Sequence, residues 1–209
     1  MVRIKICGIT NSADALAAVE AGANLLGFNF YEKSPRFITE SEAEKIRRQL
    51  PKKVEAVGIF VNASPADVTA VRNSVKLDAA QLHGDESPEI AVEIARLLPV
   101  IKAFRVESDF PLATLSEYPD AFAFLFDAAH TGQYGGTGRT TDWDVARRAA
   151  VDHRIILAGG LKVENVAAAV RIVRPYGIDV ASGVESKPGK KNHERLREFI
   201  QEVRRGERK

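Results

Sequence analysis

Two residues of the chain have side chains that could exchange protons with a substrate: the only cysteine, Cys7, and an aspartate, Asp127. Cys7 ends an alternating, β-branched run that begins at Val2, and Gly8 follows it, so the thiol lies where a strand passes into a turn. Asp127 ends an apolar run that begins at Phe122. A thiol can act as a general base or a nucleophile, and a carboxyl group can act as a general acid. The alternatives are a small buried hydrophobe for the cysteine and a turn cap for the aspartate.

Other polar residues follow further runs of this kind. Arg36 lies in a polar loop, where a guanidinium could bind a carboxylate or face solvent. His83 could be a catalyst or a polar residue that is satisfied at a strand end. Trp143 is interpreted as packing for the helix that follows it, and Lys190 with Lys191 as a solvated charge pair.

Glycine pairs or glycine-bearing loops follow the last two predicted strands, in Gly159-Gly160 and in Ser182-Gly183. Without Cβ atoms these loops let backbone N–H groups approach an anion, and a helix N-terminus adds partial positive charge. Turns also need glycine, but two such loops in succession favour a phosphate site. Asp179 lies in the last of these strands, and a further run, Gly135-Gly136-Thr137-Gly138, follows Asp127.

Short β-rich runs alternate with amphipathic segments along the chain. The predicted strands are Val2–Ile6, Asn24–Phe28, Ala56–Phe60, Ala79–Leu82, Val100–Val106, Ala123–Asp127, Arg154–Ala158 and Ile178–Val180. The predicted helices are Ser12–Ala21, Glu40–Leu50, Pro65–Val75, Pro88–Leu98, Asp142–Ala150, Lys162–Val173 and His193–Arg204, with weak helical character in Phe110–Pro119. Helix start signals are a capping box from Thr39 to Glu42 and the pairs Ser64-Pro65 and Ser87-Pro88.

Eight strands that alternate with helical crossovers predict an α/β fold of one domain over residues 1–209: a (β/α)8 (TIM) barrel with a parallel eight-stranded sheet. An open doubly wound sheet is the alternative, but the chain has neither G-x-G-x-x-G after the first strand nor a Walker A pattern. In a barrel the carboxyl ends of all the strands meet at one face. The candidate residues above would therefore lie around a single site.

Composition narrows the class of protein. The 209 residues include 30 basic and 28 acidic side chains, so the net charge is only +2, which gives little support for a nucleic-acid or polybasic membrane partner. One cysteine excludes an internal disulfide framework and a cysteine-built metal site. No apolar stretch approaches ~18 residues, and we expect a cytoplasmic protein.

Taken in order along the chain, several motifs resemble the phosphoribosylanthranilate isomerase family. They are Lys5-Ile6-Cys7-Gly8-Ile9-Thr10, Gly27-Phe28-Asn29-Phe30 with Lys33-Ser34-Pro35-Arg36, Val57-Gly58-Ile59-Phe60-Val61-Asn62, Gln81-Leu82-His83-Gly84, Asp127 to Gly138, Leu157-Ala158-Gly159-Gly160-Leu161, Asp179 to Glu185, and Pro188-Gly189-Lys190-Lys191. The resemblance implies a barrel enzyme of tryptophan biosynthesis that uses no cofactor and no metal. Its reaction would be the Amadori rearrangement of N-(5′-phosphoribosyl)anthranilate to 1-(2-carboxyphenylamino)-1-deoxyribulose 5-phosphate, a small-molecule substrate, with a homodimer left open.

The resemblance also implies roles for single residues. Cys7 would be the general base and Asp127 the general acid, and Arg36 would hold the anthranilate carboxylate. The phosphate would lie against Gly159, Gly160, Ser182 and Gly183, and His83 and Asp179 would complete the substrate-binding set. For this chemistry near neutral pH we expect the pKa of the acid to be raised and the pKa of the thiol to be lowered by cationic or helix N-terminal neighbours.

Two positions depart from the family pattern. Asn192 stands where an aspartate is expected and should change only a helix cap, since Asn caps as well as Asp. Ala128-Ala129 stand where a hydroxyl residue is expected directly after Asp127, so a supporting hydrogen bond is in question. The related sugar isomerase of histidine biosynthesis is a rival, but there the resemblance implies an aspartate at the position of Cys7. Indole-glycerol-phosphate synthase would need a catalytic lysine and an N-terminal extension. A non-catalytic phosphate-binding barrel is a further alternative, and the presence of both Cys7 and Asp127 argues against it.

Overall fold

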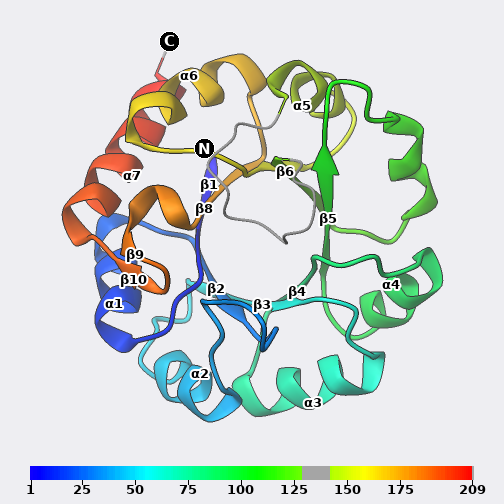
Figure 1. Ribbon diagram of the computed structural model, residues 1–209, viewed down its shortest axis with the longest axis vertical. Coiled ribbons are helices and arrows are strands. Elements are labelled where there is room, and N and C mark those ends of the chain that lie inside the picture. Colours follow the sequence, from blue (N-terminus) through cyan, green and yellow to red (C-terminus); the bar gives the residue numbers. More distant parts are fainter. Residues whose placement is uncertain (129–141, 209) are drawn as a thin grey trace.

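Eight parallel strands close into a barrel in the order β1-β2-β3-β4-β5-β6-β7-β8, and the helices form a ring around it in the computed structural model (Figure 1). The structure describes residues 1–128 and 142–208. The predicted (β/α)8 architecture is confirmed, and the doubly wound alternative is wrong because β1 pairs with both β2 and β8. The glycine-rich run at 135–138 lies outside the described residues.

The elements follow the predicted ones closely. The barrel strands are β1 (Arg3–Cys7), β2 (Leu25–Asn29), β3 (Glu55–Phe60), β4 (Ala79–Leu82), β5 (Val100–Val106), β6 (Ala123–Ala128), β7 (Ile155–Leu157) and β8 (Gly177–Val180). The helices are α1 (Ser12–Ala21), α2 (Glu40–Arg47), α3 (Pro65–Val75), α4 (Pro88–Ala95), α5 (Trp143–Ala149), α6 (Val163–Val173) and α7 (His193–Glu207), with short 3-10 helices η1 (Leu112–Glu117) and η2 (Ser182–Val184). A hairpin of β9 (Glu185–Lys187) and β10 (Lys190–Lys191) was not predicted.

Local sequence explains where several helices begin. Thr39 forms the predicted capping box with Glu42, and Ser64 caps α3 through its side chain. Ser87 is the N-cap of α4 but makes no side-chain hydrogen bond there. Asn192 caps α7 by accepting hydrogen bonds from two backbone N–H groups, which confirms that asparagine serves at this position.

Side chains inside the barrel differ in kind from those outside it. Residues alternate between the two faces of each strand, so Ile4 and Ile6 of β1 pack outward against the helices while Lys5 points to the barrel interior. The apolar interior is built from mostly small or medium side chains, namely Leu25, Val57, Ala79, Ile101, Ala103, Ala123, Leu125, Ile156 and Ala158. This composition leaves room in the centre for buried polar residues such as Lys5, Gln81 and Asp179.

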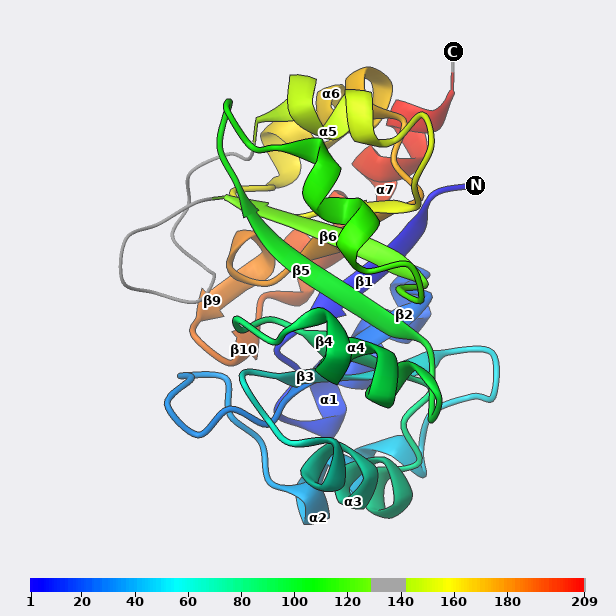
Figure 2. The same cartoon turned by 90° about the vertical axis from the view of Figure 1, so that its right-hand side faces the viewer.

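The hairpin β9-β10 lies at the end of the barrel towards which β6 points (Figure 2). It is tied to the first helix because the backbone N–H of Lys191 donates to Asp14 of α1 at 2.8 Å. Asp14 also lies 2.7 Å from His193 Nε2 at the start of α7. The hairpin thus closes one side of the face where the barrel strands end.

Within the described residues, none of the helices has the length and apolar character needed to cross a membrane.

Candidate active site

A cavity of about 510 Å³ opens at the carboxyl ends of the barrel strands. Its lining contains every site residue predicted from the sequence: Cys7, Arg36, His83, Asp127, Gly159, Gly160, Asp179, Ser182 and Gly183. These residues come from six of the eight strand ends, and closure of the barrel is what brings them together. The structure therefore brings all of these residues to one cavity, and their roles there stay predictions.

The thiol of Cys7 is half-buried at the end of β1 and lies next to a cation that sequence reasoning missed. Lys5 Nζ donates to the thiol and lies 3.0 Å from Asp179 Oδ1. Burial raises the pKa of the Cys7 thiol, Lys5 and Lys191 oppose that rise, and the carboxylate of Asp179 adds to it. The expected net lowering of the thiol pKa is therefore wrong, because the cost of burying the thiolate exceeds the attraction of the two cations.

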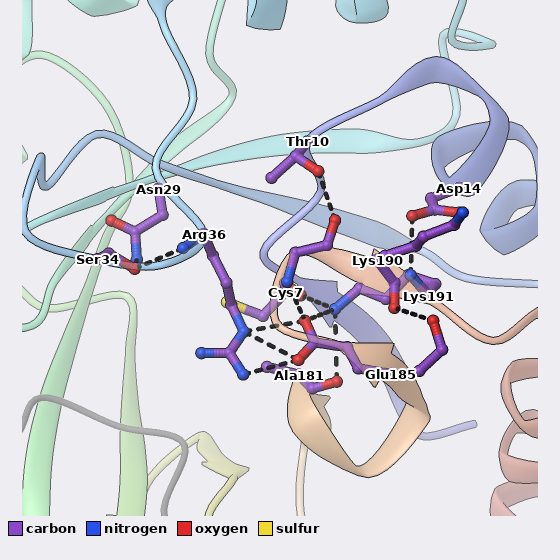
Figure 3. Close-up of polar contacts among 12 residues, drawn as sticks. Cys7, Thr10, Asp14, Asn29, Ser34, Arg36, Ala181, Glu185, Lys190 and Lys191 are labelled. Atoms are coloured by element: carbon purple, nitrogen blue, oxygen red, sulfur yellow. Dashed lines mark hydrogen bonds and ion pairs between the residues drawn. The ribbon is translucent and has the colours of Figure 1, made fainter.

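Arg36 is held in a fixed orientation at the cavity wall. Its Nε and Nη2 donate to both carboxylate oxygens of Glu185 at 2.7 to 3.2 Å, and Nη1 points away from that carboxylate (Figure 3). Gly8 makes room for the side chain, because a Cβ atom at Gly8 would lie 2.5 Å from Arg36 Cδ. The loop itself is braced by Ser34 Oγ, which accepts from Asn29 Nδ2 at 3.0 Å and from the Arg36 backbone at 3.1 Å. One edge of the guanidinium remains available to a ligand carboxylate.

Lys191 is not the solvated residue that was predicted. Its ammonium is buried and donates to the Cys7 carbonyl oxygen at 2.6 Å and to Glu185 Oε1 at 2.8 Å (Figure 3). Burial lowers the pKa of Lys191, and Glu185 partly restores it. Burial by itself raises the pKa of Glu185. Arg36 and Lys191 lower that pKa by more than burial raises it, so the net shift is downward. Lys190 is exposed, so the two neighbouring lysines have opposite environments.

His83 and Asp127 meet on another side of the cavity. His83 Nε2 lies 3.5 Å from Asp127 Oδ2, and His83 Nδ1 lies 2.7 Å from Gln81 Nε2. Gln81 is 1% exposed, and its Oε1 has no hydrogen-bond partner among the described residues. Because an amide nitrogen donates, Nδ1 accepts, and the proton of a neutral His83 lies on Nε2, where it faces the carboxylate. Position 81 was quoted in a motif but was not predicted as a site residue.

The two glycine-bearing loops touch each other along one wall. Gly159 and Gly160 have left-handed backbone angles, with φ of 77° and 63°, in the turn that leads to α6. A Cβ atom at Gly183 would lie 2.0 Å from the carbonyl oxygen of Leu161, so only glycine lets the second loop pack this closely against the first. Both loops therefore present backbone to the cavity, as a phosphate site requires.

Trp143 packs against the hydrophobic core at the start of α5, as predicted. Ala128 ends β6, and Ala129 lies outside the described residues, so the expected loss of a hydrogen bond there stays a prediction. The described part of the chain holds no group of three or more His, Cys, Asp or Glu side chains arranged to bind a metal ion.

The cavity thus combines a thiol, a carboxyl group, a fixed guanidinium and two glycine loops. A thiolate and a carboxylic acid in one cavity can move protons to and from different atoms of a bound molecule. The guanidinium suits a planar carboxylate, and the loops suit a phosphate.

Comparison with known proteins connects this geometry with one family. The model of the family described as N-(5'phosphoribosyl)anthranilate (PRA) isomerase matches residues 4–202. A curated protein named N-(5'-phosphoribosyl)anthranilate isomerase, from Pelobacter propionicus, is 50% identical over 200 residues, which cover 96% of this chain and 94% of the relative.

Solved structures agree with the family match. The crystal structure of phosphoribosyl anthranilate isomerase from Thermotoga maritima has a TM-score of 0.91 and 41% identity, and the match covers 98% of this chain and 99% of that one. A phosphoribosyl anthranilate isomerase in complex with reduced 1-(o-carboxyphenylamino)-1-deoxyribulose 5-phosphate has a TM-score of 0.88 at 40% identity, with 98% and 99% covered. A further structure, described as monomers generated from the dimeric Thermotoga maritima isomerase, has the same TM-score, identity and coverage.

Proposed function

The chain belongs to the N-(5'-phosphoribosyl)anthranilate isomerase family and is an isomerase of tryptophan biosynthesis, and from this premise we propose which residues carry out the reaction. The reaction is the Amadori rearrangement of N-(5′-phosphoribosyl)anthranilate to 1-(2-carboxyphenylamino)-1-deoxyribulose 5-phosphate. It needs a proton donor at the ring oxygen of the sugar and a proton acceptor at the second sugar carbon.

Asp127 is proposed as the general acid. It delivers a proton to the ring oxygen, and the bond between that oxygen and the first sugar carbon breaks. The lone pair of the anthranilate nitrogen, which keeps its hydrogen, forms a double bond to that carbon and gives a protonated imine. Asp127 is 8% exposed, which keeps water away from the transferred proton. His83, whose Nε2 lies 3.5 Å from Asp127 Oδ2, is proposed to orient the carboxyl group.

Cys7 is proposed as the general base. Its thiolate removes the proton from the second sugar carbon, and the electron pair of that C–H bond forms the carbon–carbon double bond of an enolamine. The electron pair of the carbon–nitrogen double bond returns to nitrogen and neutralises it. The enolamine tautomerises to the ketone product. Cys7 on β1 and Asp127 on β6 line the same cavity, so both can reach one sugar ring bound there, and this shared placement is the observation that carries the proposal.

The decisive experiment is an activity assay on the purified protein with substrate generated in place, which follows the loss of anthranilate fluorescence. Turnover is expected without added metal or cofactor. Turnover of the aminosugar substrate of histidine biosynthesis in place of the anthranilate would contradict the assignment, and so would phosphate binding with no turnover at all.

Arg36 is proposed to read the anthranilate carboxylate through Nη1. Arg36→Met should then raise KM for the substrate by about 10- to 100-fold, the worth of a hydrogen bond to a charged group. The measurement is KM for the substrate together with Kd for a product analogue that lacks the carboxylate. Lys33→Met, in the same loop and also at the cavity wall, is the matched control. If Arg36→Met weakens the binding of both ligands equally, Arg36 supports the loop and does not bind the carboxylate.

The loops at Gly159-Gly160 and Ser182-Gly183 are proposed to hold the phosphate. A valine at Gly183 would collide with Leu161 and would disrupt the loops themselves, so exposed Ser182 is the better position for a test. Ser182→Asp should weaken the binding of substrate and of inorganic phosphate alike, by about tenfold or more, because the added carboxylate and the phosphate repel each other. Ser182→Asn, of the same shape but neutral, should bind nearly as the parent does.

Inorganic phosphate should also stabilise the parent protein against thermal unfolding. Mass action predicts about 2.7 kcal/mol at a hundred times the dissociation constant. If Ser182→Asp and Ser182→Asn respond equally to phosphate in thermal unfolding, the anion binds elsewhere and the phosphate assignment is wrong.

The remaining proposals concern the whole molecule. Residues 1–209 are proposed to form one catalytic domain, because β1 and β8, near the two ends of the chain, pair to close the barrel. A cytoplasmic location and a homodimer are proposed with it, the second on the likeness to the dimeric Thermotoga maritima enzyme.

A further inference from the structure

Lys5 lies beneath the thiol of Cys7, inside the barrel. The two residues are two apart on β1, so their side chains leave the strand on the same face. Lys5 is 1% exposed, and its ammonium contacts both Asp179 Oδ1, at 3.0 Å, and the Cys7 thiol. Gly27 of the neighbouring strand provides the space, because a Cβ atom there would lie 3.1 Å from Lys5 Nζ and 3.2 Å from Cys7 Cα.

The charges of the ionic groups around the thiol do not sum to zero while the thiol is neutral. Lys5, Lys191 and Arg36 supply three positive charges, and Asp179 and Glu185 supply two negative charges. Among the described residues, this cluster is therefore neutral only when Cys7 is a thiolate. Lys191 and Arg36 are both paired with Glu185, which leaves Lys5 as the cation shared between Asp179 and the sulfur.

We propose that Lys5 is a positioning residue for the isomerase reaction: its ammonium offsets part of the cost of burying the Cys7 thiolate, the form that removes the substrate proton, and Asp179 holds Lys5 in place. This inference rests on the proposed role of Cys7 as the general base. When the thiolate accepts the proton, the S–H bond forms, the C–H electron pair passes into the enolamine, and the ammonium of Lys5 keeps Asp179 as its partner. No proton leaves Lys5 in this step.

The electrostatics of the pair agree with this role. Burial by itself lowers the pKa of Lys5, but Asp179 and Cys7 raise it more, so the ammonium stays charged inside the barrel. Within the part of the chain that the structure describes, the other ionisable groups that line the cavity are His83 and Asp127, which lie 3.5 Å from each other, and Tyr31 and Lys33.

The test uses the fact that Cys7 is the only cysteine, so alkylation by iodoacetamide reports on this thiol alone. The rate of alkylation is measured against pH in the full chain, and its midpoint gives the thiol pKa. Lys5→Met should raise the midpoint by at least about one pH unit, since a cation in contact is lost. Asp179→Asn should lower it, since the opposing carboxylate is lost while Lys5 remains.

The opposite directions separate electrostatics from loosening of the structure. If the pair only supported the fold, both variants would expose the thiol and shift its reactivity in the same direction, and that result would overturn the proposal. Lys102→Met is the matched control, because Lys102 is a buried barrel lysine paired at 2.8 Å with Glu86, away from the thiol. It should leave the midpoint unchanged.

Two further measurements keep the test decisive. If Lys5→Met does not fold, as judged by circular dichroism, the Asp179→Asn variant still tests the direction of the shift. A lowered midpoint in Asp179→Asn supports the proposal, and an unchanged or raised midpoint contradicts it. Activity of Cys7→Ser tests the base separately. Full activity there would remove the role of Cys7 in the reaction, whereas the alkylation shifts would still decide whether Lys5 stabilises the thiolate.

Discussion

Asp127→Asn is expected to leave the barrel folded and to lower kcat at least about 100-fold, the typical worth of acid–base catalysis. Asparagine has nearly the volume of aspartate, but its amide cannot give up a proton to the ring oxygen of the sugar. Because the substitution leaves the glycine loops and the other groups proposed to bind the substrate in place, KM should change much less than kcat.

The measurement is steady-state kinetics beside circular dichroism and thermal unfolding. Asp120→Asn is the matched control, since Asp120 is exposed and precedes the opposite end of β6. A folded Asp127→Asn protein that turns over at nearly the parental rate would exclude Asp127 as the acid.

Cys7→Ser is expected to cost a similar factor, at least about 100-fold in kcat/KM, because a serine hydroxyl hardly ionises at any pH the protein tolerates. Complete alkylation of Cys7 should likewise inactivate the parent enzyme, and the product or an analogue should protect it by filling the same cavity.

The pH dependence gives an independent check on the same residue. Burial raises the pKa of the Cys7 thiol, so the thiolate fraction, and with it kcat/KM, should still be rising as pH passes from neutral to alkaline values. This rising limb should be absent from the residual activity of Cys7→Ser. Unchanged activity after full modification of Cys7 would show that another group is the base.

Much of the architecture could be predicted because it depends on local patterns. Alternation of short β-branched runs with amphipathic segments determines a parallel sheet with helical crossovers, and eight such units are enough to close a barrel. The strand β4 and the helices α1 and α3 have the predicted bounds, and the signals at Thr39 and Ser64 act as expected. The ends of α2 and α4 are shorter than predicted, since amphipathic periodicity continues into the turn that follows a helix.

The hairpin β9-β10 shows where local patterns fail. Its strands have three and two residues, too few for an alternation of buried and exposed positions to be recognised. The sequence therefore could not tell Lys190, which is exposed, from Lys191, which is buried against Glu185. Pairing with Glu185 and the hydrogen bond to Asp14 of α1 decide which lysine turns inward.

The sequence by itself determined the barrel and the strand ends at which Cys7, Arg36 and Asp127 lie, because each of these depends on the residue's own neighbours along the chain. Only the tertiary structure decided the ionic state of the site. Lys5 finds Asp179, which is 174 positions away in the sequence, and Arg36 finds Glu185, which is 149 positions away. The direction of the thiol pKa shift depends on whether burial or the nearby cations have the larger effect. That balance depends on distances between residues remote in sequence, which are set only when the barrel closes.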